Sequence, residues 1–549
     1  MSSEPGSGLL VLLVAMAISM ALIPLLIRYA PVLGMMDKPD PRKVHTVPIP
    51  RVGGVGIVLG ALLPMAVWLP WNDLTISFLL GSAVLLVFGI WDDVRELGHY
   101  VKFVGQLIAV LLVVYHGDLY VSHLPLMGLE PVNEAFGRIF TVVAMVGVIN
   151  AINHSDGLDG LAGGESMLSL GAIFYLAYQV DDAVVMLISL ATMGGVFGFL
   201  RFNSYPARVF MGDGGSQFIG FALAFLVVYL TQISNPALSP ALPALLLGLP
   251  VVDILSVFAQ RVYAGMNWFR ATKNHTHHRL LKLGFQHHES VMLIYSIQTF
   301  FVISAVLLSY ESDGLLLSIY LGVCAGLFGF LIIAERMHWR LHSGRGETEI
   351  EKLIAGMDSD GILMLANRKM IQVLISAFLV LGSLSVTVVP DDLSVSAAVL
   401  FVLLLTRLIF GYHVWFLFLR LILFVAVAFV VYLMGLYPPD FLVQHSSPVY
   451  LFYGLTGLAT ALAVRVSRQE FFQVTPLDYL TLLIVIVMGV VSETGHLEES
   501  VLGVIIELII LFYGTEVVIR HMRSRWNSLT LSTLLSLGVM AVRGVFWSN

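Results

Sequence analysis

The chain has 549 residues, of which 58% are hydrophobic and only 12% charged, and its formal net charge is −7. A mean hydropathy of +0.90 excludes a water-soluble globular protein, and apolar runs of about 17–25 residues indicate membrane-spanning helices. The sequence shows no signature of nucleic-acid binding, and the single cysteine, Cys324, excludes an internal disulfide.

The first apolar run, Leu9 to Ile27, is long and has no basic residue before it, so we expect an uncleaved span and not a signal peptide. Eleven spans are predicted near residues 9–27, 53–70, 75–91, 101–116, 139–150, 166–180, 183–200, 215–233, 241–260, 291–309 and 315–334. Seven more are predicted near 370–389, 394–410, 414–436, 448–464, 476–491, 500–518 and 528–546. The fold class is therefore all-α: a polytopic membrane protein with a core (1–335), a hydrophilic connector (336–369) and a C-terminal block (370–549).

Basic residues lie mostly on one side of the predicted core. The loops after spans one, three, five, seven and nine hold fourteen Lys and Arg residues, whereas the opposite loops hold only Arg138. Because cytoplasmic loops carry the excess of Lys and Arg, we expect the first set to be cytoplasmic and the N-terminus to be outside.

The third of these loops, NAINHSDGLDGLAGG, runs from Asn150 to Gly164 and carries two carboxylates three residues apart, Asp156 and Asp159. If both belong to the start of the next helix, they share one face. Carboxylates are costly at a membrane boundary, which favours a functional site, although a turn rich in Asp and Asn is the alternative.

The second loop carries adjacent carboxylates, Asp92 and Asp93, and a basic residue further on, Lys102. Neighbouring residues on a helix point about 100° apart, so the two carboxylates cannot do the same job. One could face a metal or a nucleophile and the other hold the local structure, with Lys102 meeting a phosphate, but such a pair can also be ordinary solvated surface.

The fourth loop, RFNSYPARVFMGDGGSQFIG, places Asp213 among glycines at the start of a helix. Such a carboxylate suits a hard cation beside phosphate oxygens, and Asn203 and Phe210 could recognise and stack a base. The alternative is a glycine-rich turn.

The fifth loop contains His275, His277 and His278, and the first is basic and proline-rich, with His45 in DKPDPRKVHTVPIPRVGG. Three histidines in four residues allow a zinc site, but HExxH and paired cysteines are missing. Partly protonated imidazoles beside a diphosphate fit equally well, and His287 and His288 are interpreted as bystanders. The first loop is either an anion clamp or an ordinary positive-inside loop.

Together, carboxylates, basic groups and glycines on one side of one membrane describe a divalent metal that holds a nucleotide diphosphate. A transporter would instead place its charges near mid-membrane, in broken helices. A zinc-dependent intramembrane hydrolase would lose activity to zinc chelators and need no magnesium.

Residues 1–335 resemble the polyprenyl-phosphate N-acetylhexosamine-1-phosphate transferases. The resemblance rests on RKVH and PRVGG, the Asp92–Asp93 pair, NAINHSDGLDG, FNSYPARVFMGDGGS, and Arg261 followed by HTHH. The basic first loop is similar to that of the branch transferring GlcNAc-1-phosphate or a related sugar, as in O-antigen initiation. It is unlike the MurNAc-pentapeptide branch.

The resemblance implies that undecaprenyl phosphate attacks the β-phosphorus of a UDP-sugar and releases UMP, with Mg²⁺ required and Mn²⁺ able to substitute. It also implies the bacterial inner (cytoplasmic) membrane, with the active site facing the cytoplasm and the lipid bilayer as a partner. By resemblance Asp213 is the metal ligand and Asp92 the base, with Asp93 beside it, while Asp156 and Asp159 border the metal and nucleotide. The residues implied in substrate binding are Lys102, Asn150, Asn153, Asn203, Phe210, Arg261, His275, His277 and His278. A one-step displacement and a covalent aspartyl intermediate both stay open, as does the oligomeric state, a homo-oligomer included.

The chain departs from the family in two places. Thr272 stands where members often carry an aspartate, three residues before HxHH, and the block after residue 335 has no counterpart in the family core. Within that block, Glu507 lies inside a predicted span, where it is either a functional charge or a partner of a polar neighbour.

Overall fold

The computed structural model describes residues 5–37, 39, 47–128, 130–266, 274–341, 362–410, 416–439, 441–442, 447–466, 480, 483, 499–519 and 527–546. His45, Thr272 and nearly all of the span expected at 476–491 lie outside these residues. Contacts along the chain define two compact units, the first holding Met1–Gly344 and Thr475–His496 and the second Arg345–Val474 and Leu497–Asn549.

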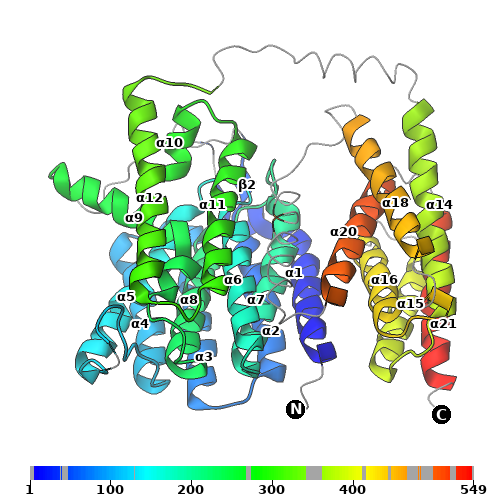
Figure 1. The fold of residues 1–549 in the computed structure, drawn as a ribbon, viewed down its shortest axis with the longest axis horizontal. Coiled ribbons are helices and arrows are strands. Elements are labelled where there is room, and N and C mark those ends of the chain that lie inside the picture. Colours follow the sequence, from blue (N-terminus) through cyan, green and yellow to red (C-terminus); the bar gives the residue numbers. More distant parts are fainter. Residues whose placement is uncertain are drawn as a thin grey trace. The chain divides into compact units, whose positions relative to one another are not determined.

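The first unit is a helical bundle (Figure 1). Its helices are α1 (Pro5–Leu33), α2 (Gly53–Trp68), α3 (Asp73–Arg95), α4 (His99–Leu111), α5 (Glu134–Ser155), α6 (Leu161–Tyr178), α7 (Ala183–Asn203), α8 (Gly212–Tyr229), α9 (Leu242–Tyr263), α10 (Thr276–Lys282), α11 (His287–Leu307) and α12 (Asp313–Arg336). Short π-helical turns, Leu112–His116 and Leu230–Ser234, extend α4 and α8.

Every one of the eleven spans expected in the core coincides with one of these helices, and α10 is the short addition. Across the described residues of both units, ten helices are long and apolar enough to cross a membrane. The all-α, polytopic fold class is confirmed.

Helix α8 is the most deeply buried of the candidate spans in the described residues, and it packs against α2, α3 and α5. Glycines make the closest of these contacts possible. A Cβ atom on Gly89 of α3 would lie 2.1 Å from the Gly214 Cα atom, and one on Gly54 of α2 would lie 2.3 Å from the Gly215 nitrogen. The first turn of α8, which carries Asp213, is therefore held between two helix backbones.

A two-residue antiparallel ladder, β1 (Met36–Asp37) with β2 (Ile49–Pro50), lies between α1 and α2. It is joined to the segment before α8, because the Phe210 nitrogen donates to the Pro50 carbonyl (2.8 Å) and the Gly53 nitrogen donates to the Phe210 carbonyl (3.0 Å). These backbone bonds bring the first and fourth loops together.

Helix α9 is broken at Gly248, where φ is +49° and ψ is −130°, two residues before Pro250. The freed backbone groups find side-chain partners: the Leu249 nitrogen donates to Gln298 Oε1 (3.2 Å), and the Tyr320 hydroxyl donates to the Gly248 carbonyl (3.0 Å). Buried polar side chains from α11 and α12 therefore stabilise the break.

The second unit is also helical. Its described helices are α14 (Ile362–Ser385), α15 (Asp391–Phe410), α16 (Phe416–Leu436), α18 (Ser447–Val466), α20 (Glu499–Ile519) and α21 (Ser528–Phe546). Within it the Tyr453 hydroxyl donates to the Glu507 carboxylate, so Glu507 has the polar neighbour that one of the two alternatives expected.

Candidate functional site

A cavity of about 750 Å³ collects the chemistry-bearing loops of the first unit. Its wall is built from segments far apart in the sequence, which begin at Asp37 and end at His287. The residues predicted for the site that line it are Asp92, Asp93, Lys102, Asn153, Asp156, Asp159, Asn203, Phe210, Asp213 and His278. Four predicted residues, Asn150, Arg261, His275 and His277, are not among its lining residues in the described part of the chain.

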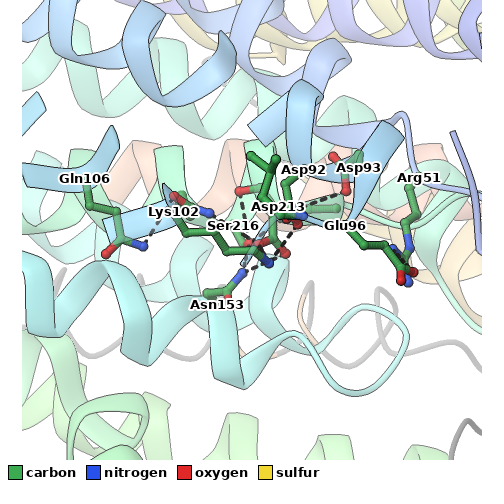
Figure 2. A network of polar contacts seen from close by, with 12 residues as sticks. Arg51, Asp92, Asp93, Glu96, Lys102, Gln106, Asn153, Asp213 and Ser216 are labelled. Atoms are coloured by element: carbon green, nitrogen blue, oxygen red, sulfur yellow. Dashed lines mark hydrogen bonds and ion pairs between the residues drawn. The ribbon is translucent and has the colours of Figure 1, made fainter. Parts of the chain in front are cut away.

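One lysine joins two carboxylates in the cavity wall (Figure 2). Lys102 Nζ lies 2.7 Å from Asp92 Oδ2 and 2.7 Å from Asp213 Oδ2, so it bridges the end of α3 and the start of α8. Asp213 also accepts hydrogen bonds from Asn153 Nδ2 (3.2 Å) and Gln217 Nε2 (3.3 Å). The Asp213 carboxylate is thus the point where α4, α5 and α8 meet.

Asp92 and Asp93 are both buried, in the last turn of α3, but they have different partners. Asp92 pairs with Lys102 and accepts from the Leu97 nitrogen (2.6 Å). Asp93 instead accepts from the Asp213 backbone nitrogen (3.2 Å). Asp92 therefore belongs to the charged cluster, whereas Asp93 fixes the backbone that carries Asp213.

Asn150 lies behind the cavity, in a series of buried amides. Gln217 Oε1 accepts from Gln106 Nε2 (3.3 Å), and Gln106 Oε1 accepts from Asn150 Nδ2 (2.8 Å). Gln217 in turn donates to Asp213, so Asn150 reaches the site only through two glutamines, neither of which the sequence analysis singled out.

The DGLDG loop (residues 156–160) corrects one expectation. Asp156 and Asp159 do not share a helix face, because α5 ends at Ser155 and α6 begins only at Leu161. Gly160, at φ +81°, holds a left-handed conformation that separates the two helices. The loop is fixed instead by Asp159, whose carboxylate accepts from the Ala207 nitrogen (2.9 Å) and whose backbone nitrogen donates to His287 Nε2 (3.1 Å).

Asp156 carries the clearest electrostatic perturbation outside the spans. Burial in the cavity wall, with the charges of Asp213 and Asp159 nearby, raises the pKa of its carboxyl to about 7. The neighbouring carboxylates thus oppose a further negative charge at this point of the wall.

Asn203 and Phe210 both line the cavity, but the Asn203 amide is already engaged. Its Oδ1 accepts from the Gly160 nitrogen (2.8 Å) and its Nδ2 donates to the Val209 carbonyl (2.9 Å). The residue is 2% exposed and ties the DGLDG loop to the segment before α8.

The histidines of the fifth loop divide into two groups. His278 lines the cavity, whereas His275 and His277 are buried beneath it. Burial and the charges of neighbouring histidines lower the pKa of His277 to about 3, which favours the neutral imidazole at this position. Among the described residues, no group of three or more His, Cys, Asp or Glu side chains is arranged to hold a metal ion.

Further residues that the sequence analysis did not assign to the site contribute to the wall. His287, interpreted as a bystander, lines the cavity and stacks on Tyr205 with ring centroids 4.4 Å apart, so that interpretation is wrong. Arg51 lines the rim, where it pairs with Asp37 and lies 3.8 Å from Glu96. His287 lies outside every motif considered in the sequence. Its place at the site becomes evident from its hydrogen bond with Asp159 in the folded protein.

The charges around Asp213 do not cancel. Asp92 and Asp213 share the Lys102 ammonium, and the Asp93 carboxylate lies beside them, on the Asp213 backbone nitrogen. If all three carboxylates are ionised, two negative charges remain, and hard oxygen donors are the ligands that Mg²⁺ prefers.

Comparison with known proteins identifies the family of this chain. The family model described as glycosyl transferase family 4 matches residues 75–231, which contain most of the cluster. A probable undecaprenyl-phosphate N-acetylglucosaminyl 1-phosphate transferase of Bacillus subtilis is 32% identical over 329 residues, covering 59% of this chain and 90% of the relative.

Two further relatives match about half of the chain. A decaprenyl-phosphate N-acetylglucosaminephosphotransferase of Mycobacterium leprae is 33% identical over 47% of this chain and 72% of its own length. The undecaprenyl-phosphate alpha-N-acetylglucosaminyl 1-phosphate transferase of Escherichia coli strain K12 is 28% identical over 48% and 73%. The chain therefore belongs to glycosyl transferase family 4, among the polyprenyl-phosphate N-acetylhexosamine-1-phosphate transferases.

Proposed function

We propose that this chain transfers an N-acetylhexosamine-1-phosphate, such as GlcNAc-1-phosphate, from a UDP-sugar to undecaprenyl phosphate, releasing UMP. The observation that carries the proposal is the Lys102-bridged carboxylate cluster inside a cavity of about 750 Å³, a volume typical of small-molecule sites. The named relatives support the lipid acceptor and the sugar phosphate.

In the proposed reaction, a phosphate oxygen of the lipid forms a bond to the β-phosphorus of the UDP-sugar. The bond from that phosphorus to the bridging oxygen breaks, and UMP leaves with this oxygen. Lys102 would meet a phosphate and Asp92 would act as the base for the lipid phosphate, and the ion pair between them in the cavity wall supports these roles. Positioning and charge neutralisation, more than covalent chemistry, would lower the barrier.

The proposed cofactor is Mg²⁺, with Mn²⁺ as a substitute. Asp213 would hold it, with Asp92 and Asp93 close by. When bound, the cation would neutralise the negative charge of the diphosphate.

The loops that line the cavity are those that hold most of the Lys and Arg residues of the core. This distribution supports a site on the cytoplasmic side of the bacterial inner membrane, open to the cytoplasmic UDP-sugar pool.

The test incubates the purified full-length protein with undecaprenyl phosphate and a panel of UDP-sugars, and measures UMP. We expect UMP only when both substrates and Mg²⁺ or Mn²⁺ are present. Asp213→Asn should abolish turnover without unfolding the protein, because the amide keeps the shape but loses the charge. Asp118→Asn, which alters an exposed carboxylate paired with Arg138, is the matched control and should stay active. Full activity in EDTA or in Asp213→Asn would contradict the metal assignment, and no UMP with any sugar would contradict the reaction.

A further inference from the structure

A buried carboxylate outside the cavity organises the fifth loop. Asp253 lies on α9, beyond the break at Gly248, and is 8% exposed. Its Oδ2 atom is 2.7 Å from His275 Nδ1, and its Oδ1 atom accepts from the Thr276 backbone nitrogen (2.7 Å) and the Thr276 hydroxyl. Both oxygens are thus occupied by the two residues at which α10 begins.

These contacts specify which nitrogen of His275 faces a hydrogen-bond acceptor. An ionised carboxylate only accepts hydrogen bonds, so Nδ1 must carry a proton, and in the neutral form of the imidazole this leaves Nε2 as an acceptor. Asp253 also satisfies the first backbone donor of α10, which has no capping side chain of its own.

A stack of imidazoles leads from His275 towards the cavity. The His275 ring stacks on His154 at 5.2 Å and on His277 at 5.9 Å, with planes 20° and 9° apart. His277 in turn packs on the DGLDG loop, because a Cβ atom on Gly157 would lie 2.2 Å from His277 Nε2. His278, the next residue, lines the cavity. The ring centroids of His277 and His278 are 4.2 Å apart.

The geometry points to Asp253 as a positioning residue that locks the wall formed by the DGLDG loop and His278. This inference rests on the proposed function and extends it: Asp253 sets the affinity for the phosphorylated sugar donor. The proposed function assigns the lipid phosphate to Lys102 and Asp92, which come from α4 and α3 and not from the DGLDG loop or α10, so Asp253 should not set its affinity.

The kinetic test compares Asp253→Asn with Glu335→Gln in the full-length protein. Glu335 also anchors α10, through a two-bond pair with Arg279 (2.8 and 2.9 Å), but on α12 and away from the cavity. We expect Asp253→Asn to raise the KM for the UDP-sugar about 10- to 100-fold, since small misplacements carry penalties of that size. The KM for undecaprenyl phosphate should not change, and Glu335→Gln should alter neither constant. An unchanged donor KM in Asp253→Asn, or equal effects of both variants, would overturn the inference.

A spectroscopic test needs no turnover. In Asp253→Asn, an amide oxygen that stays with Thr276 turns the NH2 group towards His275, which must then present a lone pair at Nδ1 and carry its proton on Nε2. The ¹⁵N spectrum of histidine-labelled protein should show this tautomer switch, with the His275 signal identified by its loss in His275→Asn. If the His275 tautomer were the same in both proteins, the positioning of His275 by Asp253 would be refuted. If the native protein released no UMP but the switch occurred, the proposed function would fail, while the positioning of His275 by Asp253 would be supported.

Discussion

Asp92 and Asp93 are neighbours in the sequence, yet their carboxylates meet different groups. Asp92 faces the Lys102 ammonium, and Asp93 faces a backbone nitrogen at the start of α8. An amide oxygen can replace a carboxylate as acceptor from a backbone nitrogen, but it cannot replace the charge opposite a lysine. The two positions should therefore respond differently to the same substitution.

We predict that Asp92→Asn lowers kcat on the order of 100-fold or more, as expected for loss of a general base. Asp93→Asn should cost less, because its hydrogen bond to Asp213 survives. The measurement is kcat for both variants across pH 6–9, where native activity should flatten at high pH. Near-normal kcat in Asp92→Asn at every pH would remove the base assignment.

Asp156 gives a pH dependence of stability. Its pKa is about 7 in the folded protein and about 4 in an unfolded chain. Between these values the folded protein binds the proton more tightly, so this group destabilises the fold progressively as the pH rises towards 7.

The prediction is that Asp156→Asn gains thermal stability relative to the native protein as the pH increases. In detergent and magnesium-free buffer, the melting temperature of the variant should exceed that of the native protein by more at pH 8 than at pH 5. A difference that is the same at both pH values would show that Asp156 does not titrate in this range.

At the scale of elements, the glycine contacts of α8 set the position of the cluster. Asp213 stands in the first turn of α8, directly before the glycines that touch α3 and α2. No side-chain rotation can relieve a clash between a new Cβ atom and a backbone atom, so the helices would have to separate.

Gly89→Ala should therefore destabilise the first unit by about 1–3 kcal/mol and reduce activity by displacing Asp213. Gly171→Ala, in α6, is the matched control, because a Cβ atom there meets nothing within 4 Å. Melting temperature and UMP release report the two effects. Equal stability of the two variants would mean that the contact between α3 and α8 is looser than the structure has it.

The sequence was sufficient to locate the helices of the core, because long apolar runs report membrane spans directly. Motifs also located most of the cavity wall. What the sequence could not supply were contacts that depend on folding: His287 against Asp159, Asp253 against His275, and Gln106 between Gln217 and Asn150. Each joins residues that lie on different helices or loops, and no local pattern marks the partner. The helix-face expectation for Asp156 and Asp159 was wrong because Gly160 interrupts the helix.

For the whole molecule, the proposed orientation can be tested with cysteines at exposed positions. In a Cys324→Ser background, Glu96→Cys and Lys282→Cys should resist a membrane-impermeant thiol reagent added outside intact cells. Met127→Cys, which is 61% exposed in the loop between α4 and α5, should react. His275 is too buried to serve as such a probe. If Lys282→Cys were labelled from outside the cell, the proposed orientation would be wrong.

A second whole-molecule prediction concerns the division of the chain. All described residues of the cavity precede residue 290, so a protein ending near Gly344 should insert, bind magnesium and release UMP. What should be lost is a partner, an oligomer contact, or delivery of lipid carrier and product. The comparison is between full-length and shortened protein in the same detergent at saturating substrate. A shortened protein that is monodisperse but inactive would place the later block in the catalytic machinery.

The bond between Asp159 and His287 also has a meaning for biosynthesis. The two residues are 128 positions apart, so the DGLDG loop can form this hydrogen bond only after His287 has been synthesised. At a translation rate of about 5–20 residues per second, this interval lasts on the order of 10 s. Asp92, Asp93 and Lys102 are synthesised before this interval and Asp213 within it, but the cavity wall is not complete until His287 follows. A nascent chain that stops before His287 can therefore insert into the membrane, but its substrate cavity lacks part of the wall.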